Sequence, residues 1–192
     1  MSDQELRCWL EQAVNGDGLA FEKIYLYTRD DVYRTVSFLA GNPHDVNDIV
    51  NEVYIQLWKS LTKYDSSRPF RYWLHGLVVR QVHDWRRKIW RRLRLINRQK
   101  EMSTGETIVQ TDDHTLQNET RDEIVSEVQK LSYKLRAVIT LRYFHDYTLE
   151  EIATLLEIPI GTVKSRHNLA IKELRKKCGN LKEGKVSLFD VH

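Results

Sequence analysis

The sequence predicts an all-α chain of two small helical domains joined by a flexible linker, with a helix-turn-helix in the second domain. Glycine and proline, which interrupt helices, are sparse, with 8 and 3 in 192 residues. Apolar residues recur three and four positions apart over nearly the whole chain, as in amphipathic helices. Between residues 96 and 118 this periodicity stops and polar, small and acidic residues take over, which is typical of a linker.

The first half is expected to contain four helices, at about residues 4–15, 19–39, 42–64 and 70–94. In the third of these, Asn42 suits an N-cap and Pro43 the first helical position. The apolar stripe of the fourth includes Trp73 and Trp85, whose rings are expected to pack in the core. Helices resume near Thr120. The predicted divisions are a first domain at 1–95, the linker at 96–118, a second domain at 119–178 and a tail at 179–192.

Charge is segregated along the chain, although the net charge is only +3. Cations dominate residues 80–100, where Asp84 is the single acid, and they dominate again over residues 164–185. Acids prevail between these blocks, at residues 101–127. Two basic blocks separated by an acidic one predict two DNA-facing modules.

The composition points away from membrane proteins, disulfide-linked proteins and enzymes. No apolar run approaches the roughly 20 residues of a membrane helix, and no signal segment begins the chain, so a cytoplasmic protein is expected. Cys8 and Cys178 lack the spacing of a zinc site or a disulfide framework. The 7 histidines are scattered, with no phosphate-binding glycine loop and no nucleophile with a spaced base. We therefore predict no catalytic site, cofactor or metal ion.

Residues 148–177 have the form of a helix-turn-helix. Thr148 can cap a short helix, and Glu151 completes a capping box three residues later. Pro159 cannot continue that helix, and Gly161 gives the turn conformational freedom. Thr162 is then expected to cap the second helix, which in such motifs lies in the major groove of DNA.

A helical wheel divides this second helix into two faces. The core side is expected to hold Val163, His167, Ala170 and Leu174. The opposite side carries cationic and amide groups suited to phosphates and base edges, namely Lys164, Ser165, Asn168, Lys172 and Arg175. The alternative is a solvated basic helix in an unrelated bundle.

Two features of the first half suggest binding surfaces. A polar ridge with helical spacing, which a partner helix could recognise, comprises Asp48, Asn51, Glu52 and Gln56. The following segment, residues 64–74, interleaves aromatic rings with cations, the groups that an unstacked base and a freed DNA strand require. Within that segment the loop residues Tyr64, Asp65 and Arg68 are the better candidates for contacting DNA.

Two motifs resemble those of the bacterial sigma factors. The sequence IPIGTVKSR at residues 158–166, preceded by LRYFHDYTLEEIA at 141–153, is similar to the promoter-binding region four. The sequence DVNDIVNEVYIQLWKSL at residues 45–61 is similar to region two. Both regions occur in the family's order, and the intervening third domain of larger sigma factors is missing. The chain therefore resembles the extracytoplasmic-function group of the sigma-70 family.

This resemblance implies partners and residue roles. The family binds the RNA polymerase core, at the clamp coiled coil through the polar ridge and at the flap, and it binds promoter DNA; an anti-sigma factor is a further expected partner. The implied contacts to the minus-thirty-five element involve Arg142, Thr162, Lys164, Ser165, Arg166, Asn168 and Lys172. The implied contacts to the minus-ten element involve Tyr64, Asp65, Arg68, Phe70, Arg80, Asp84, Arg87 and Lys88.

The sequence departs from the family pattern at several positions, so base preference does not transfer. Many relatives carry basic residues at the positions of Leu169 and Ile171, and an aliphatic residue at that of His167. Val79 and Arg80 replace a frequent Arg-Asn pair. An ordinary helix-turn-helix regulator, which would bind duplex operator without the polymerase, is the rival interpretation.

Overall fold

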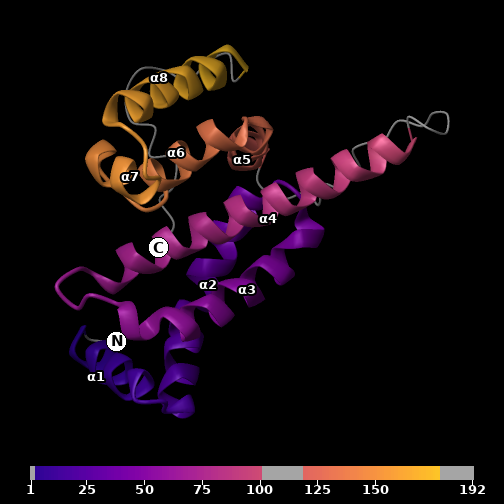
Figure 1. Cartoon of the computed structure of the whole chain (residues 1–192). Helices are drawn as coiled ribbons and strands as arrows, with labels where there is room; N and C mark the ends of the chain where they lie inside the picture. Colours follow the sequence, from indigo (N-terminus) through magenta and orange to yellow (C-terminus); the bar gives the residue numbers. More distant parts are fainter. Residues whose placement is uncertain (1–2, 101–118, 178–192) are drawn as a thin grey trace.

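The computed structural model describes residues 3–100 and 119–177. Within these ranges all regular elements are helical, which confirms the all-α prediction (Figure 1). They are α1 (Asp3–Val14), α2 (Gly18–Ala40), the 3-10 helix η1 (Pro43–Asp45), α3 (Val46–Ser60), the 3-10 helix η2 (Leu61–Lys63), α4 (Phe70–Lys100), α5 (Glu119–Lys130), α6 (Tyr133–Tyr143), α7 (Leu149–Leu155) and α8 (Ile160–Lys177). Most of the predicted linker, and the whole of the predicted tail, lie outside the described residues.

Two helix boundaries in the first half differ from the sequence prediction. Helix α4 continues past the expected end near Arg94 to Lys100, because this stretch is rich in good helix formers and contains no glycine or proline. Asn42 caps η1 instead of α3, since its side-chain oxygen accepts a hydrogen bond from the backbone N–H of His44 at 3.1 Å. The α-helix proper begins only at Val46.

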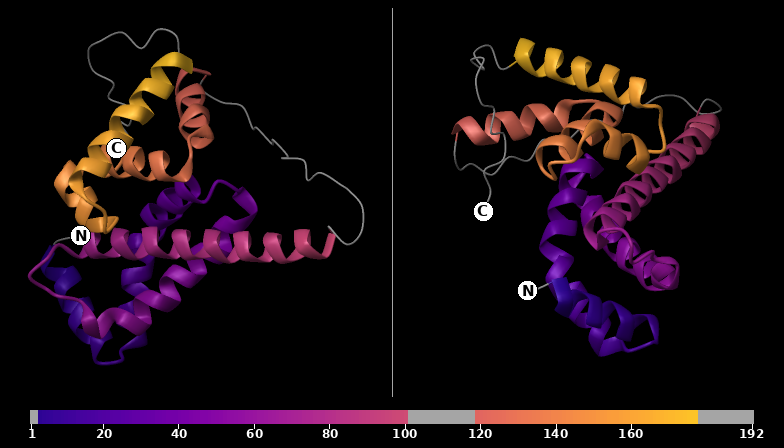
Figure 2. Two further views of the ribbon diagram at one scale, coloured as in Figure 1. Left: turned by 45° about the horizontal axis from the view of Figure 1, so that its top comes forward. Right: turned by 90° about the vertical axis from the view of Figure 1, so that its left-hand side faces the viewer.

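The long helix α4 lies between the two halves of the chain. It packs on α2 and α3 on one side, and its N-terminal part contacts α7 on the other (Figures 1 and 2). Helix α2 also contacts α6, and the Tyr133 hydroxyl of α6 donates to the backbone oxygen of Val79 in α4 at 3.3 Å. At Gly76 of α4 a Cβ atom would lie 3.2 Å from Leu155 of α7, which shows how closely the two helices approach.

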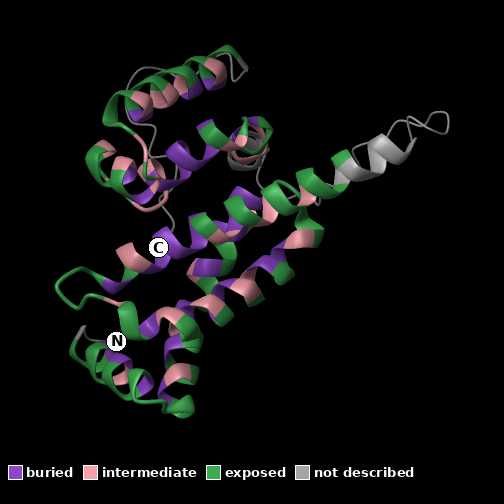
Figure 3. Ribbon diagram, in the orientation of Figure 1, coloured by how far each residue is buried: buried purple, intermediate pink, exposed green. Residues whose placement is uncertain are grey.

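Buried apolar side chains run continuously from the first half into the second (Figure 3). The main core contains the inner faces of α1 to α4 and also Val138, Leu141, Ile152 and Val163 of the second half. A smaller core, formed by α5, α6 and α8 with the turn between α5 and α6, comprises Val128, Leu131, Leu135, Ile139, Ala170 and Leu174. The second half therefore packs both on itself and on the first half.

Two arginines satisfy the C-terminal carbonyl groups of α2. Arg136 of α6 is 3% exposed and donates from Nη2 to the backbone oxygen of Leu39 at 3.2 Å. Arg86 of α4 donates to the backbone oxygen of Ala40 at 3.1 Å. Cations at a helix C-terminus are favourable because they complement the helix dipole. Burial, with the nearby charge of Arg86, lowers the pKa of Arg136 to about 10, which still leaves the side chain cationic at neutral pH.

None of the helices in the described part of the chain is both long and apolar enough to cross a membrane.

Gly41 should be a sensitive position for stability. It ends α2 with φ +82°, in the left-handed region, and an added Cβ would lie 2.8 Å from Nη2 of Arg136. We expect Gly41→Ala to lower the free energy of unfolding by about 1–3 kcal/mol, measured by urea denaturation. Gly18→Ala is the matched control, because nothing lies within 4 Å of its added Cβ. Equal effects of the two substitutions would contradict this account.

Candidate nucleic-acid interface

The helix-turn-helix is formed by α7 and α8, and its first cap agrees with the prediction. The Thr148 hydroxyl accepts from the backbone N–H of Glu151 at 3.2 Å, and the Glu151 carboxylate accepts from the backbone N–H of Thr148 at 2.8 Å. This capping box satisfies backbone donors at both residues, so the start of α7 is fixed by local sequence.

The turn between α7 and α8 is built differently from the prediction. Glu157, with φ 54°, is the left-handed residue, and the N–H of Ile158 donates to the oxygen of Ala153 at 3.0 Å. This is a Schellman-type end, which orients the chain for a new helix directly after Pro159. Helix α8 starts at Ile160, so Thr162 lies within its first turn and is not its N-cap. Gly161 is likewise helical.

Helix α8 presents one face to solvent and buries the other. Val163, Ala170 and Leu174 are buried, as the helical wheel predicts. His167 is partly buried and lies 3.1 Å from the Tyr143 hydroxyl, and this burial lowers its pKa. All the side chains expected on the DNA face are exposed, namely Lys164, Ser165, Asn168, Lys172 and Arg175. The core side of α8 thus fixes which polar groups face outward.

Two predicted minus-thirty-five arginines are less exposed than the others. Arg142 donates to the backbone oxygen of Tyr147 at 3.0 Å, which holds the segment between α6 and α7. Arg166 lines a cavity of about 720 Å³ between α4 and the second half, together with Arg80 and Arg87. Residues expected at the two promoter elements therefore face the same cavity.

The loop before α4 is organised by its own polar side chains. The Tyr64 hydroxyl donates to the backbone oxygen of Arg68 at 2.7 Å. The Asp65 carboxylate accepts from the N–H of Ser67 at 3.0 Å, and the hydrogen bonds from Ser67 lower the pKa of Asp65. Phe70 is the exception among the predicted DNA contacts, since it is 5% exposed and packs in the core. Phe70 is the first residue of α4, and its ring packs edge-on to Tyr64. Its role here is therefore to support the loop.

Helix α4 carries the remaining candidates on its outer surface. Arg80, Asp84, Arg87 and Lys88 are exposed. Arg80 lies 3.8 Å from the carboxylate of Glu157, at the turn between α7 and α8. The expected minus-ten surface of α4 is therefore turned partly toward the helix-turn-helix.

The polar ridge lies on α3, which packs on α2 and α4 and lies across α4 from the second half (Figure 1). Asp48 and Asn51 are exposed, while Glu52 and Gln56 are partly buried. The Gln56 amide donates to the Glu52 carboxylate at 2.7 Å, which joins two members of the ridge.

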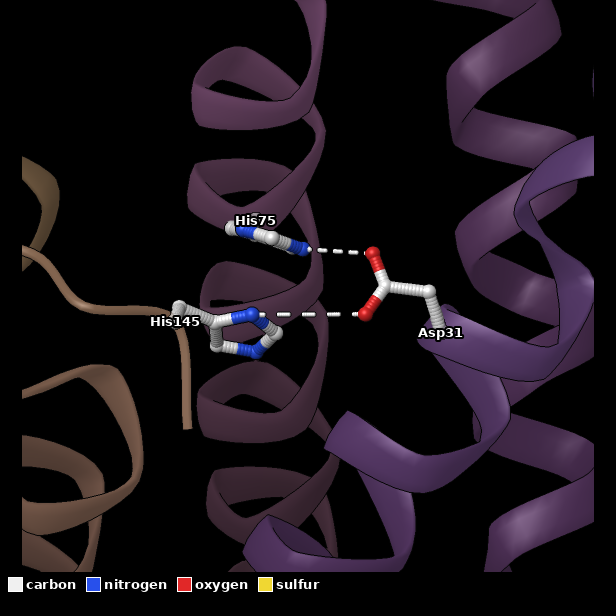
Figure 4. Close-up of side chains that lie close together, drawn as sticks. All are labelled: Asp31, His75 and His145. Atoms are coloured by element: carbon white, nitrogen blue, oxygen red, sulfur yellow. Dashed lines mark hydrogen bonds and ion pairs between the residues drawn. The ribbon is translucent and has the colours of Figure 1, made fainter. Parts of the chain in front are cut away.

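A polar cluster between the halves was not predicted from the sequence. The carboxylate of Asp31 in α2 lies 3.0 Å from His75 Nε2 in α4 and 4.0 Å from His145 Nδ1 after α6 (Figure 4). The histidine side chains are 3% and 5% exposed. Three residues this far apart in sequence carry no common motif, and only the packing of α2, α4 and the segment after α6 brings them together.

The cluster is set in an electrostatic environment of its own. Burial raises the pKa of Asp31, but the hydrogen bond and charge interaction with His75 outweigh this, so the net pKa is below its usual value. Burial, together with the charge of His75, lowers the pKa of His145 to about 3. Burial also raises the pKa of Tyr147, whose hydroxyl lies 2.6 Å from His75 Nδ1. Asp31 is thus an anion that interacts with His75 of α4 and with His145 after α6.

Comparisons with known proteins are consistent with this architecture. Residues 24–92 match the family model "Sigma-70 region 2", and residues 128–176 match "Sigma-70, region 4". The chain is similar to the ECF RNA polymerase sigma factor SigW of Bacillus subtilis, with 29% identity over 90% of this chain and 96% of SigW. It is also similar to the ECF RNA polymerase sigma-E factor of Escherichia coli, with 28% identity over 86% of this chain and 88% of that protein.

Two solved structures share the fold. The sigma factor RpoE of Bartonella quintana, in complex with the anti-sigma factor NepR, has a TM-score of 0.64 at 19% identity, covering 85% of this chain and 98% of that one. CnrH, in complex with the cytosolic domain of CnrY, has a TM-score of 0.59 at 22% identity, covering 90% and 96%.

Asp31 should contribute to stability through its charge. We expect Asp31→Asn to lower the free energy of unfolding by about 1.5–3 kcal/mol, because it removes a largely buried charge-assisted hydrogen bond to His75. Chemical denaturation followed by circular dichroism measures this effect. Asp30→Asn is the control, since the neighbouring Asp30 side chain is 79% exposed. A loss of stability no greater than that of the control would remove the cluster from the interactions that stabilise the fold.

Proposed function

The chain belongs to the extracytoplasmic-function group of the sigma-70 family and is an RNA polymerase sigma factor. From this premise we propose which of its surfaces bind the polymerase and which bind each promoter element. The region 2-like half would bind the polymerase core and the minus-ten element. The region 4-like half would bind the minus-thirty-five element. The observation that carries this division is the outward polar face of α8, held by a buried stripe on its other side.

In the second half, α8 would read DNA from the major groove. Lys164, Ser165 and Asn168 near its N-terminal end are exposed and suited to base edges. Lys172, one turn further along, would contact the phosphate backbone. Support for this assignment comes from the rigid connection of α7 and α8, which sets the orientation of the helix.

In the first half, the loop at Tyr64, Asp65 and Arg68 would receive an unpaired minus-ten base. The support is that the loop combines an aromatic ring, a carboxylate acceptor and an exposed cation. The exposed cations of α4, including Arg87 and Lys88, would then hold the freed strand.

On the far side of α4, the ridge of Asp48, Asn51, Glu52 and Gln56 would dock on the clamp coiled coil of the polymerase. Its support is the exposure of Asp48 and Asn51 together with position, because α3 lies away from the second half (Figure 1). The flap of the polymerase would bind the second half. Two polymerase contacts would thus hold the two halves in separate places.

Use of a whole promoter requires the two halves to move apart. The minus-ten and minus-thirty-five elements lie about 25 base pairs apart, or roughly 85 Å at 3.4 Å per base pair of B-DNA. In this structure Arg80 and Arg166, one candidate for each element, line a single cavity. The arrangement described here would therefore be a closed form of the free protein, which opens when polymerase binds.

The remaining assignments follow from the same function. The protein would act in the cytoplasm as a non-catalytic DNA-recognition subunit, without a catalytic site. An anti-sigma factor is a proposed partner, since the RpoE structure with a similar fold contains one. Such a partner would hold the factor away from the polymerase until a signal releases it.

The test of this function is run-off transcription on genomic fragments with purified core polymerase. We expect promoter-specific transcripts that depend on the protein. Asp48→Arg and Glu52→Arg should weaken binding to the core and reduce these transcripts while leaving the circular dichroism unchanged, because charge reversal opposes docking of the ridge.

Glu22→Arg supplies the matched control, as it makes the same charge change at an exposed position of α2. Normal core affinity of the ridge variants would exclude the ridge from the interface. Tight binding to duplex DNA without polymerase, combined with no support of initiation, would favour an ordinary helix-turn-helix regulator.

Two substitutions in α8 should separate base reading from anchoring. Asn168→Ala should alter discrimination at one or two base pairs of the upstream element, by roughly 1–3 kcal/mol. Lys172→Ala should weaken binding to all promoters similarly. It should also reduce the slope of the logarithm of the binding constant against the logarithm of the salt concentration by about one unit. Binding of each variant in holoenzyme to a promoter panel at several salt concentrations measures both effects. The reverse pattern would show that α8 meets DNA with a different face.

A further inference from the structure

Three side chains of the metal-ligand type converge between the two halves. We propose that Asp31, His75 and His145 bind a divalent first-row transition metal ion, Zn²⁺ foremost, and that the ion ties the second half to the first. One ligand atom from each residue lies within 4.8 Å of the other two. Two imidazole nitrogens with one carboxylate oxygen suit such ions, and three protein ligands leave a fourth position for water.

Hydrogen bonding fixes the tautomer of His145. The Thr35 hydroxyl donates its one proton to the backbone oxygen of Asp31 at 2.7 Å. Its contact with His145 Nε2 at 3.0 Å therefore uses the proton of that nitrogen. In neutral His145 the bare Nδ1 then faces a carboxylate oxygen of Asp31 at 4.0 Å. Two acceptors face one another across this gap, an arrangement that a cation between them would stabilise.

Hydrogen-bond partners at both ring nitrogens also orient His75 for metal binding. Its Nε2 lies 3.0 Å from the Asp31 carboxylate and its Nδ1 lies 2.6 Å from the Tyr147 hydroxyl. Histidines that bind metals usually have their other ring nitrogen hydrogen-bonded, and here Tyr147 and Thr35 supply the two partners. When the ion takes Nε2, the proton of neutral His75 moves to Nδ1, where the Tyr147 oxygen accepts it. Both ligands therefore keep their supporting hydrogen bonds.

The ligand atoms lie near enough to one another to be drawn into a tetrahedral site. Metal–ligand bonds of about 2.0–2.1 Å place tetrahedral ligand atoms about 3.4 Å apart. The separations of 3.0 and 4.0 Å involve different oxygens of Asp31, and one ligand atom from each residue lies within 4.8 Å of the other two (Figure 4). Modest side-chain rotations would complete the site. A cavity of about 740 Å³, lined by all three ligands, offers a path for the ion.

Two arginines on the wall of this cavity, Arg34 and Arg71, have hydrogen-bond partners other than Asp31. Arg71 donates to the Tyr27 hydroxyl at 3.2 Å. Arg34 donates from Nε to the backbone oxygen of Asp30 at 3.2 Å and lies over the Phe144 ring. Both guanidinium groups are thus held by other contacts, and Asp31 remains the anion that the histidines face.

Because the ligands come from α2, α4 and the segment between α6 and α7, only the closed arrangement assembles the whole site. An ion that binds this arrangement preferentially stabilises it by mass action. The predicted metal binding is independent of the proposed function. Only its consequence, that the ion opposes the opening required for promoter binding, rests on the sigma-factor role.

The test is titration of the metal-free full chain with Co²⁺, followed by visible absorption and by displacement with Zn²⁺. We expect one Co²⁺ per chain, with absorption bands typical of low coordination number, and at least tenfold weaker binding in His75→Ala and His145→Ala. Tyr147→Phe, which removes only a supporting hydroxyl, should weaken binding about tenfold. Zn²⁺ should also slow hydrogen exchange over residues 145–155 in the wild type but not in His145→Ala.

Two controls match these variants. His83→Ala removes an exposed histidine whose Nδ1 lies 3.7 Å from the Asp84 carboxylate. Tyr72→Phe removes another hydroxyl between the halves, which donates to the backbone oxygen of Glu151 at 3.1 Å. Neither should change metal affinity. Absence of saturable binding by the wild type, or equal effects of control and ligand variants, would overturn the proposal. If the histidine variants fail to fold, the Co²⁺ affinities of Tyr147→Phe and Tyr72→Phe are compared instead, and equal affinities would overturn the proposal.

Discussion

The carboxylate of Asp31 is the group on which the arrangement of the two halves depends. A charged group that is largely removed from water requires partners, and those of Asp31 come from α4 and from the segment after α6. For His75 to contact Asp31, α4 must run beside the part of α2 that carries Asp31. For His145 to contact Asp31, the second half must lie against the same part of α2. The apolar contacts of α6 and α7 with the first half are made in the arrangement that satisfies this charge.

The C-terminal end of α2 repeats the principle, with backbone oxygens in place of the carboxylate. The carbonyl groups of its last turn are acceptors that need donors, and Arg86 and Arg136 supply them from α4 and α6. Polar side chains from each half of the chain thus hold α2 both at Asp31 and at its last turn. Between Asp31 and the last turn of α2 the contact is apolar except for the Thr35 hydroxyl at His145, so the interface combines hydrophobic burial with polar groups that determine its register.

This packing conflicts with the function that the surfaces support. The groups suited to DNA lie on α8, on the outer surface of α4 and in the loop before it, and Arg80 and Arg166 face one cavity. A promoter would separate them by more than two helical turns of DNA, about 25 base pairs at roughly 10.5 base pairs per turn. The proposed docking of α3 on the polymerase would not compete with the closed form, because α3 lies across α4 from the second half. The energetic cost of engaging DNA would therefore be the loss of the contacts around Asp31 and Arg136.

The sequence by itself determined the helices, the capping box at Thr148 and the two faces of α8, because these depend on spacings of three and four residues and on local hydrogen bonds. Local sequence was not sufficient where alternatives were close in energy. It favoured Gly161 for the turn, whereas Glu157 adopts the left-handed conformation. The family resemblance assigned Phe70 to DNA, although that ring is buried in the core. The cluster of Asp31, His75 and His145 was decided by tertiary structure alone. Its members lie on segments far apart in sequence, and their proximity arises only when burial of apolar surface brings α2, α4 and α6 together.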